Sequence, residues 1–222
     1  MVRLTLFNRS RSTCSHRVRI VLALKGLDYE YVPVGKPSDE HSGVTYQARS
    51  PTGYVPCLVV DGVPYVESVA IIERLEDLVP EPPLYPEDSH RRARVRTLVE
   101  IVNSGIQPLQ NSSIVAQVAA ATNDETAREW TRRCIARGLG AFERAMEVNE
   151  REGTAGPYAY GPTPTAADAF LVPQVVAAER VGVDLRANAR VMAAFEAAMR
   201  LEAFQKADPR VQIDAAPRPD PR

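Results

Sequence analysis

The sequence predicts an α/β domain with the element order βαβ and then ββα, followed by an all-α domain. Strand and helix patterns alternate over residues 2–34, which is typical of a βαβ unit. Two short runs of β-formers over residues 57–66 enclose an Asp-Gly pair, which is a strong hairpin signal. Beyond residue 86 the apolar residues recur with a helical period, and no strand pattern is evident.

The first strand and helix follow from the spacing of apolar side chains. Val2, Leu4 and Leu6 alternate with polar residues, as in a half-buried strand. Apolar residues then recur at steps of three and four over residues 18–24, which predicts a helix that ends at Gly26.

Residues 29–34 alternate again and are rich in β-formers. A whole helix precedes them, so this strand is predicted to run parallel to the first. The connection over residues 35–50 is polar, and a short helix is predicted within it over residues 44–48.

Residues 57–60 predict a buried strand, and residues 63–66 predict an antiparallel return strand after the two-residue turn Asp61-Gly62. Ser68 then stands at the start of an amphipathic helix. With the short connecting helix included, the predicted order is βαβαββα.

Prolines crowd residues 80–86, and a helix cannot continue through them, so a domain boundary is expected there. We assign residues 1–82 to the α/β domain, 83–88 to a linker and 89–213 to the all-α domain. Residues 214–222 contain several prolines and few apolar residues, which predicts a disordered tail.

The all-α domain has long helical patterns over residues 91–121 and 125–150, and a shorter one near residues 187–201. Thr165 precedes an apolar run and is followed three residues later by Asp168. This spacing predicts a capping box at the start of a central helix.

Composition excludes several classes of partner. The chain has 222 residues, 45% of them hydrophobic, and its net charge of −1 favours neither nucleic acid nor an anionic membrane. Its three cysteines lack framework spacing and its histidines lie apart from them, so we expect reduced thiols and no metal site. The first residues resemble a strand rather than a secretory signal, and no apolar run could span a bilayer. A cytoplasmic protein with a small-molecule partner is expected.

Hydroxyl groups and a thiol stand where the first helix begins, in Ser12, Thr13, Cys14 and Ser15. A helix N-terminus offers unpaired N–H groups and partial positive charge, which favour an anion such as a carboxylate or a thiolate. Two interpretations remain open from the residues alone. The hydroxyls either serve an anion site or only cap the helix.

The stretch over residues 11–20 reads Arg-Ser-Thr-Cys-Ser-His-Arg-Val-Arg-Ile. It resembles the R-S-S-C-S-x-R-V-R-I signature of the zeta class of glutathione transferases, the maleylacetoacetate and maleylpyruvate isomerases. Further similar motifs occur, in order, at residues 54–56, 70–76, 105–111, and 171–175 followed by 178–180. The resemblance implies a thioredoxin-like βαβαββα domain followed by the all-helical C-terminal domain of a glutathione transferase, and it implies a homodimer.

The resemblance also implies that glutathione is the cofactor. Val55, before a cis proline at Pro56, would present its backbone to the cysteinyl part, and Glu67 and Ser68 would bind the γ-glutamyl end. The family usually has Gln where this chain has Glu67, and an acid suits the ammonium there. The implied glutathione-binding residues are Ser12, Thr13, Cys14, Ser15, His16, Arg17, His41, Val55, Glu67, Ser68, Gln107, Asn111, Ser112 and Ser113.

Some of these assignments have a structural alternative. The four polar residues between 107 and 113 also fit a polar stripe on a solvated helix face. His41 lies in a loop about two residues shorter than is usual in the family. Arg17 and Arg19 are also expected to form structural pairs on the flank of the first helix.

The implied chemistry is cis–trans isomerisation of a conjugated oxo-dicarboxylic acid by reversible addition of a thiolate. Ser12 is the expected hydroxyl donor that keeps the sulfur ionised, with Thr13 as the alternative. Cys14 fits either a rival nucleophile or a small packing residue.

Arg11 and Arg180 are expected to bind the substrate carboxylates, because guanidinium groups bind carboxylates in a bidentate manner. Their alternative is a surface charge or ion pair. Some maleylpyruvate isomerases carry an arginine where this chain has Ser113, so the cationic pocket is weaker here.

Two other functions remain open at this stage. One keeps the thiolate and changes its acceptor to another unsaturated or halogenated acid, with isomerisation, conjugation or dehalogenation as the outcome. The other is a non-catalytic, transferase-like binding protein. Ser12, Cys14, Val55-Pro56 and Ser68 occurring together favour an active site over this last function.

Overall fold

The computed structural model describes residues 2–35 and 44–215, and the chain divides into two compact units. The first unit comprises the described residues up to Pro82 together with those from Glu202 onward, and the second spans Pro83–Leu201. His41 and residues 216–222 of the predicted tail lie outside the described residues.

A four-stranded sheet forms the centre of the first unit. Its strands are β1 (Leu4–Asn8), β2 (Glu30–Pro33), β3 (Cys57–Val60) and β4 (Val63–Val66), in the order β2-β1-β3-β4. β2 runs parallel to β1, whereas β3 runs antiparallel to both β1 and β4. The predicted parallel strand and the predicted hairpin are both confirmed.

Local chemistry explains the hairpin. Asp61 and Gly62 have φ values of 49° and 88°, as the two central positions of a type I′ turn require. Pro64 lies in β4 at the edge of the sheet, where a missing N–H breaks no ladder.

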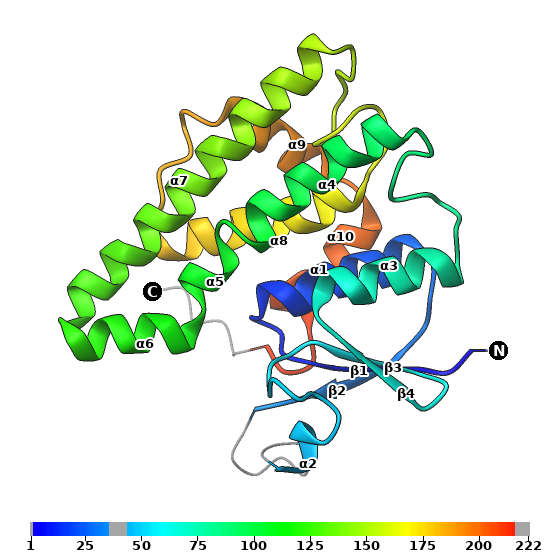
Figure 1. The fold of residues 1–222 in the computed structure, drawn as a ribbon, viewed down its shortest axis with the longest axis vertical. Coiled ribbons are helices and arrows are strands. Elements are labelled where there is room, and N and C mark those ends of the chain that lie inside the picture. Colours follow the sequence, from blue (N-terminus) through cyan, green and yellow to red (C-terminus); the bar gives the residue numbers. More distant parts are fainter. Residues whose placement is uncertain (1, 36–43, 216–222) are drawn as a thin grey trace. The chain divides into compact units, whose positions relative to one another are not determined.

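Two helices cover one face of this sheet. α1 (Thr13–Leu24) and α3 (Ser68–Leu78) lie side by side there, and the short α2 (Val44–Gln47) lies beyond the opposite face (Figure 1). The core under α1 and α3 includes Leu6, Ile20 and Ile71, all fully buried. Burying each such side chain contributes about 1.5–3 kcal/mol.

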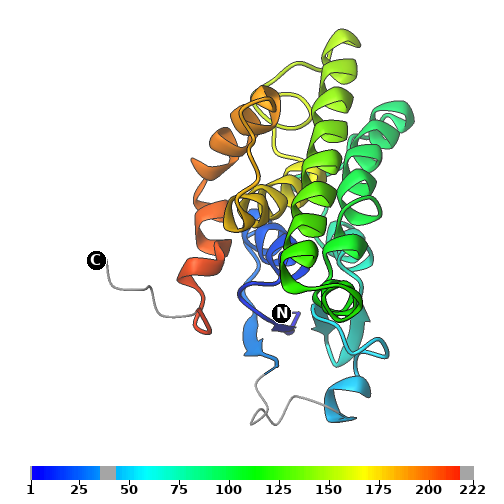
Figure 2. The same ribbon diagram turned by 90° about the vertical axis from the view of Figure 1, so that its left-hand side faces the viewer.

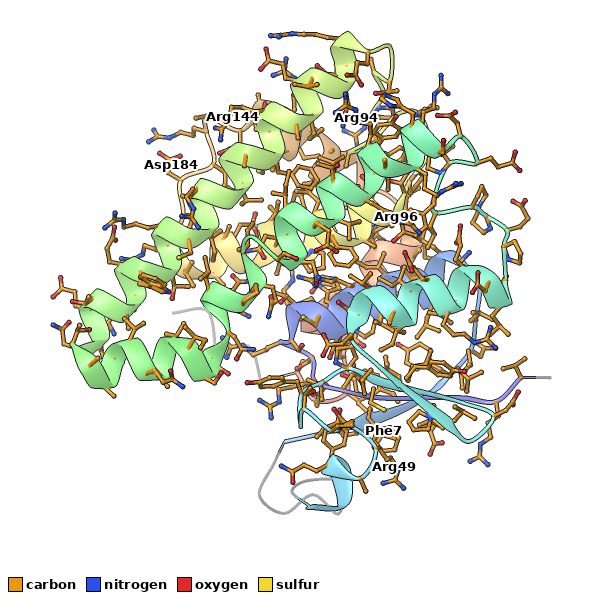
Figure 3. The ribbon with its side chains drawn as sticks, in the orientation of Figure 1. Phe7, Arg49, Arg94, Arg96, Arg144 and Asp184 are labelled. Atoms are coloured by element: carbon orange, nitrogen blue, oxygen red, sulfur yellow. The ribbon has the colours of Figure 1, made fainter. Side chains whose placement is uncertain are left out.

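The opposite face of the sheet has its own small core. Phe7, Val32, Tyr46 and Cys57 are buried together there. The guanidinium carbon of Arg49 lies 5.3 Å from the centre of the Phe7 ring, a cation–π contact visible in Figure 3.

The C-terminal residues belong to the first unit, which differs from the predicted all-α domain ending at residue 213. α10 (Glu202–Ala207) packs against α1, and a 3₁₀ turn (Pro209–Val211) follows. The physical reason is the buried guanidinium of Arg19, whose Nε donates to the carbonyl oxygen of Ala207 at 3.1 Å. A buried cation needs such acceptors, and α10 provides one.

The second unit is helical throughout its described elements. These are α4 (Ser89–Asn103), α5 (Gln107–Gln110), α6 (Ser112–Ala121), α7 (Asp124–Arg151), α8 (Ala166–Val181) and α9 (Ala189–Met199). α8 packs against α4, α7 and α9 and is buried along most of its length, as predicted for a central helix. Figure 2 shows α4 and α7 running beside one another.

The structure divides the helix predicted over residues 91–121 into α4, α5 and α6. Just after the end of α4, an added Cβ at Gly105 would lie only 2.5 Å from the carbonyl oxygen of Ile101, so only glycine fits where the chain leaves this helix. Asn111 then begins a new helix, because its Oδ1 accepts the N–H of Ser113 at 3.1 Å.

The predicted capping box at α8 is confirmed. Asp168 Oδ2 accepts the N–H of Thr165 at 2.8 Å, and Asp168 Oδ1 accepts the N–H of Ala159 at 2.7 Å. Burial raises the pKa of Asp168 to about 6, although these hydrogen bonds favour the ionised form.

Within residues 2–35 and 44–215, no helix is both long enough and apolar enough to cross a membrane. Over the same residues, no three His, Cys, Asp or Glu side chains are grouped in a way that could hold a metal ion.

Candidate active site

The turn between β1 and α1 places a hydroxyl group at the start of a helix. Ser12 is the N-cap of α1, and its Oγ accepts the N–H of Ser15 at 3.2 Å. Its own N–H donates to the carbonyl oxygen of Arg9 at 3.1 Å, which closes the turn. Because Oγ is the acceptor of the capping bond, the hydroxyl proton of Ser12 can be donated to another group. The structure therefore combines a hydroxyl donor with the positive end of a helix dipole.

The next residues differ in their exposure. Thr13 and Cys14 lie half-buried in the first turn of α1. Ser15 and His16 are buried, and Ser15 Oγ accepts the N–H of Arg9 at 3.4 Å. The side chains of Ser15 and His16 therefore pack within the first unit, and their contact with glutathione stays a prediction.

His16 is neutral at physiological pH. Burial, and then the nearby positive charge of Arg19, lower the pKa of His16 to about 3. Asp208 opposes this shift and Arg210 adds to it. Nε2 of His16 is buried and has no hydrogen-bond partner, which is consistent with an imidazole that carries no charge.

A second helix N-terminus in the same unit lies beside a buried guanidinium. Ser68 begins α3, and its Oγ accepts a hydrogen bond from Nη1 of the buried Arg17 at 3.1 Å. The N–H groups of α3, the Ser68 hydroxyl and a guanidinium are thus gathered at one point. This combination favours a carboxylate.

Glu67 occupies an unusual backbone conformation directly before this helix. Its φ is 67°, a region that residues with a Cβ rarely adopt. Its side chain is exposed and makes no capping bond to α3. An exposed carboxylate beside an anion site suits a ligand that carries an ammonium next to a carboxylate, such as the γ-glutamyl group.

The loop before β3 presents the backbone of Val55. The Val55–Pro56 peptide bond is cis, as the resemblance implied. The carbonyl oxygen of Tyr54 accepts hydrogen bonds from the hydroxyl of Tyr46 at 2.8 Å and from Ser50 Oγ at 2.9 Å. Burial raises the pKa of Tyr46, so its hydroxyl remains a donor. Neither Tyr46 nor Ser50 belongs to a recognisable motif, so the sequence did not predict their role here.

The other two cysteines lie within regular secondary structure. Cys57 lies in β3 and Cys134 in α7, and both are buried, as a role in the core would require. Burial raises the pKa of the Cys57 thiol to about 11. All three cysteines of the chain are unpaired.

The second unit holds the remaining predicted residues. Gln107 lies in α5, and its Oε1 accepts from Nε2 of Gln110 at 2.9 Å. Gln110 also exchanges hydrogen bonds with the fully buried Gln174, at 2.8 and 3.1 Å. Gln110 and Gln174 therefore hold the side chain of Gln107, although the motifs gave them no such role.

Asn111 and Ser113 are bonded to each other, because Asn111 Oδ1 accepts from both the N–H and the hydroxyl of Ser113, at 3.1 and 3.0 Å. Their observed role is to begin α6, and Ser112 stands exposed between them. Arg11 is exposed next to Ser12, and Arg180 is exposed in the last turn of α8.

The polar groups of the first unit fit a small peptide thiol. They include a helix N-terminus and a guanidinium at Ser68 and Arg17, an exposed acid at Glu67, the backbone of Val55 before a cis proline, and a hydroxyl group at Ser12. Glutathione carries a matching carboxylate, ammonium, peptide backbone and thiol.

Comparisons with known proteins agree with this fit. Two family models match the chain, the glutathione S-transferase N-terminal domain over residues 11–78 and the glutathione S-transferase C-terminal domain over residues 129–211. The maleylacetoacetate isomerase of Mus musculus is 41% identical over 211 residues, which are 94% of each chain.

Solved structures extend the likeness to three dimensions. Maleylacetoacetate isomerase from Anaeromyxobacter dehalogenans 2CP-1, with glutathione bound in its active site, is 43% identical with a TM-score of 0.85 and covers 97% of this chain and 99% of its own. A holo structure of maleyl pyruvate isomerase, a bacterial zeta-class glutathione S-transferase, has a TM-score of 0.89 at 37% identity and covers 96% of this chain and 100% of its own. The fold class expected from the sequence is confirmed. This chain belongs to the glutathione S-transferase family, in the zeta class with the maleylacetoacetate isomerases.

Proposed function

We propose that this enzyme uses glutathione as its cofactor to isomerise the cis double bond of a conjugated oxo-dicarboxylic acid of the maleylacetoacetate or maleylpyruvate type. The observation that carries the proposal is the Ser12 hydroxyl, which caps α1 through its oxygen and keeps its proton for another acceptor. The names of the relatives and the glutathione bound in the Anaeromyxobacter dehalogenans structure support the same activity.

When bound, glutathione supplies a thiolate that adds reversibly to one carbon of the double bond, so that rotation about this bond becomes possible. Ser12 is proposed to donate its hydroxyl proton toward the sulfur, with Thr13 as the alternative donor. The N-terminal dipole of α1 adds to this preference for negative charge. Thr13 and Cys14 are half-buried beside Ser12, so each is proposed as a contact.

The rest of the first unit is proposed to orient the tripeptide. Ser68 and Arg17 would bind the γ-glutamyl carboxylate, because a guanidinium and a helix N-terminus converge there. Glu67 would face the ammonium, and the backbone of Val55 would pair with the cysteinyl part. Gln107, Asn111, Ser112 and Ser113 remain proposed contacts from the second unit.

Arg11 and Arg180 are proposed to bind the two carboxylates of the substrate, because guanidinium groups stay charged at all relevant pH values. Each substitution by Gln should therefore raise KM more than it lowers kcat. An equal fall in kcat and in kcat/KM, with KM unchanged, would instead assign the arginine to the transition state.

One ultraviolet assay tests the proposed activity. Purified protein is mixed with cis enone acids such as maleylacetone and maleylpyruvate, with and without glutathione. Conversion to the trans acid should require glutathione, and Ser12→Ala should lower kcat by about 100-fold, as removal of one catalytic donor does elsewhere. Ser104→Ala is a matched control, because this exposed serine lies at the end of α4 and bonds only locally to Glu100.

Two outcomes would contradict the proposal. If no cis enone acid is converted in the presence of glutathione, the enzyme is not an isomerase of this class. If the product retains a glutathionyl group, the thiolate acts on a different acceptor and the chain is a conjugating transferase.

We also propose that the protein is a cytoplasmic homodimer that binds a small anionic substrate. The unpaired state of all three cysteines supports a reducing compartment. Light scattering on the purified protein tests the dimer, and fractionation of cells tests the compartment.

A further inference from the structure

The turn that carries Ser12 is held by a residue from the far end of the chain. A carboxylate oxygen of Asp214 accepts the N–H of Ser10 at 2.9 Å, and the carbonyl oxygen of Asp214 accepts the Ser10 hydroxyl at 3.1 Å. The hydroxyl of Tyr31 donates to the other carboxylate oxygen. Ser10 is 2% exposed and lies two residues before Ser12. The contacts of Asp214 are therefore directed at the turn that carries the proposed donor.

The opposite side of the same turn is held by Arg19. Its Nη2 donates to the carbonyl oxygen of Ser10 at 2.9 Å, and its Nη1 donates to the carbonyl oxygen of Arg9 at 3.3 Å. The N–H, the hydroxyl and the carbonyl of Ser10 are thus all bonded, two of them by Asp214. A shift of this turn would break several buried hydrogen bonds at once, at a cost of about 1–3 kcal/mol for each group left without a partner.

Apolar burial does not explain why residues 208–215 lie against this turn. Val211 and Ile213, two apolar side chains of this segment, are 63% and 76% exposed. Gln212 bonds within its own neighbourhood, to the carbonyl oxygens of Lys206 and Asp208. Asp214 is the residue that supplies hydrogen bonds from the segment to the β1–α1 turn. Asp214 therefore contributes hydrogen bonds to the turn, whereas its segment contributes little apolar burial.

We propose that Asp214 is a positioning residue for the thiol chemistry, because it fixes Ser10 and thereby the place of the Ser12 hydroxyl at the start of α1. This inference rests on the proposed function. Ser10 and Ser12 belong to one tight turn, because the N–H of Ser12 donates to the carbonyl oxygen of Arg9. A shift of Ser10 therefore displaces Ser12. A displacement of a catalytic group by about 1 Å lowers a rate by about 100-fold.

The test compares wild type with Asp214→Ala, Asp214→Asn and the control Asp184→Asn. Asp184 is an exposed carboxylate of the second unit that pairs locally with Arg186. Four quantities are measured: the pKa of the thiol of bound glutathione from its ultraviolet thiolate absorbance, the dissociation constant of glutathione, kcat for the cis enone acid, and the melting temperature.

Asp214→Ala should raise the pKa of the bound thiol by about one unit, because the Ser12 donor is misplaced. It should lower kcat by about 10- to 100-fold. The dissociation constant of glutathione should change less, because Val55 and Ser68 lie on other segments of the first unit. Asp214→Asn should change the thiol pKa and kcat less, because its amide oxygen still accepts the N–H of Ser10. The control Asp184→Asn should match wild type in both quantities.

The outcomes separate this inference from the proposed function. If Asp214→Ala keeps the thiol pKa and kcat of wild type, or lowers only the melting temperature, Asp214 is merely structural and the inference is wrong. If Asp214→Ala does not fold, Asp214→Asn and Tyr31→Phe decide by the same two readouts. A wild type that ionises bound glutathione without isomerising any acid refutes the proposed function alone, and the thiol pKa still decides the inference. A wild type that does not ionise glutathione refutes both.

Discussion

Protonation of His16 should destabilise the first unit in mild acid. The folded state holds this imidazole neutral, with a pKa of about 3 against 6.5 in the unfolded chain. A lowered pKa on a basic group means that the unfolded chain binds the proton first. The resulting stability is complete above about pH 6.5 and is lost as the pH falls toward 3.

The magnitude follows from this gap. A pH of about 5 lies about one and a half units below the pKa of His16 in the unfolded chain. Each pH unit is equivalent to about 1.4 kcal/mol. The contribution of His16 to the free energy of unfolding should therefore fall by about 2 kcal/mol between pH 7.5 and pH 5. Asp168 titrates in the opposite direction over this interval, because its pKa is raised to about 6.

The variant His16→Gln separates the effect of His16 on stability from that of Asp168. Glutamine is neutral at every pH, so the variant should lack the acid-induced loss that comes from position 16, while Asp168 is common to both proteins. Urea denaturation at about pH 7.5 and pH 5 should show that wild type loses about 2 kcal/mol more than the variant. Any cavity left by the substitution lowers the free energy of unfolding of the variant equally at the two pH values, so it does not affect the difference between them. If the two proteins lose stability in parallel, burial does not hold His16 neutral and the reasoning is wrong.

Three further substitutions test the packing, each by urea denaturation. Lys25→Met should cost about 3–5 kcal/mol, because the buried Nζ pairs with Glu76 at 2.7 Å and donates to the carbonyl oxygens of Val79 and Pro82. The double variant with Glu76→Gln should recover part of this loss. If it recovers none, the ion pair does not contribute to stability. Gly138→Ala should cost about 1–3 kcal/mol, because its Cβ would lie 2.1 Å from Cγ1 of Ile106. The control Gly140→Ala, with only Arg144 Nη1 at 3.6 Å, should be neutral or stabilising, and equal effects at the two glycines would contradict this account. Asp168→Ala should cost about 2–4 kcal/mol near neutral pH, because two buried N–H groups lose their acceptor. This cost should grow by up to about 3 kcal/mol as the pH falls from 6 to below 4, since a raised carboxyl pKa stabilises the fold in acid, and a cost independent of pH would show that the carboxyl pKa is not raised.

The sequence predicted the sheet because its signals are local. The alternation around Leu4 and Leu6, and the two positive φ values that Asp61-Gly62 supplies, are properties of a few neighbouring residues. The capping box at Thr165 and Asp168 is equally local and was predicted with its residues. The single helix expected over residues 91–121 was wrong, because Gly105 and Asn111 interrupt it.

Contacts between distant residues could not be predicted from pattern. Arg19 was expected to form a structural pair, yet its acceptor at Ala207 lies 188 positions away. No periodicity records such a partner, so the return of α10 to the first unit was missed. The proposed site divides in the same way: Ser12 and Ser68 follow from cap signals, whereas Tyr46, Ser50 and Asp214 emerge only from the folded chain.

The return of α10 to the first unit bears on the order in which the protein is made. Translation delivers the sheet first and the segment that completes Arg19's shell of acceptors last. The acceptors of Arg19 at Asn8, Arg9 and Ser10 are synthesised with the sheet, whereas its acceptor at Ala207 is synthesised after the whole second unit. The part of the chain that is synthesised first therefore completes its hydrogen bonds last.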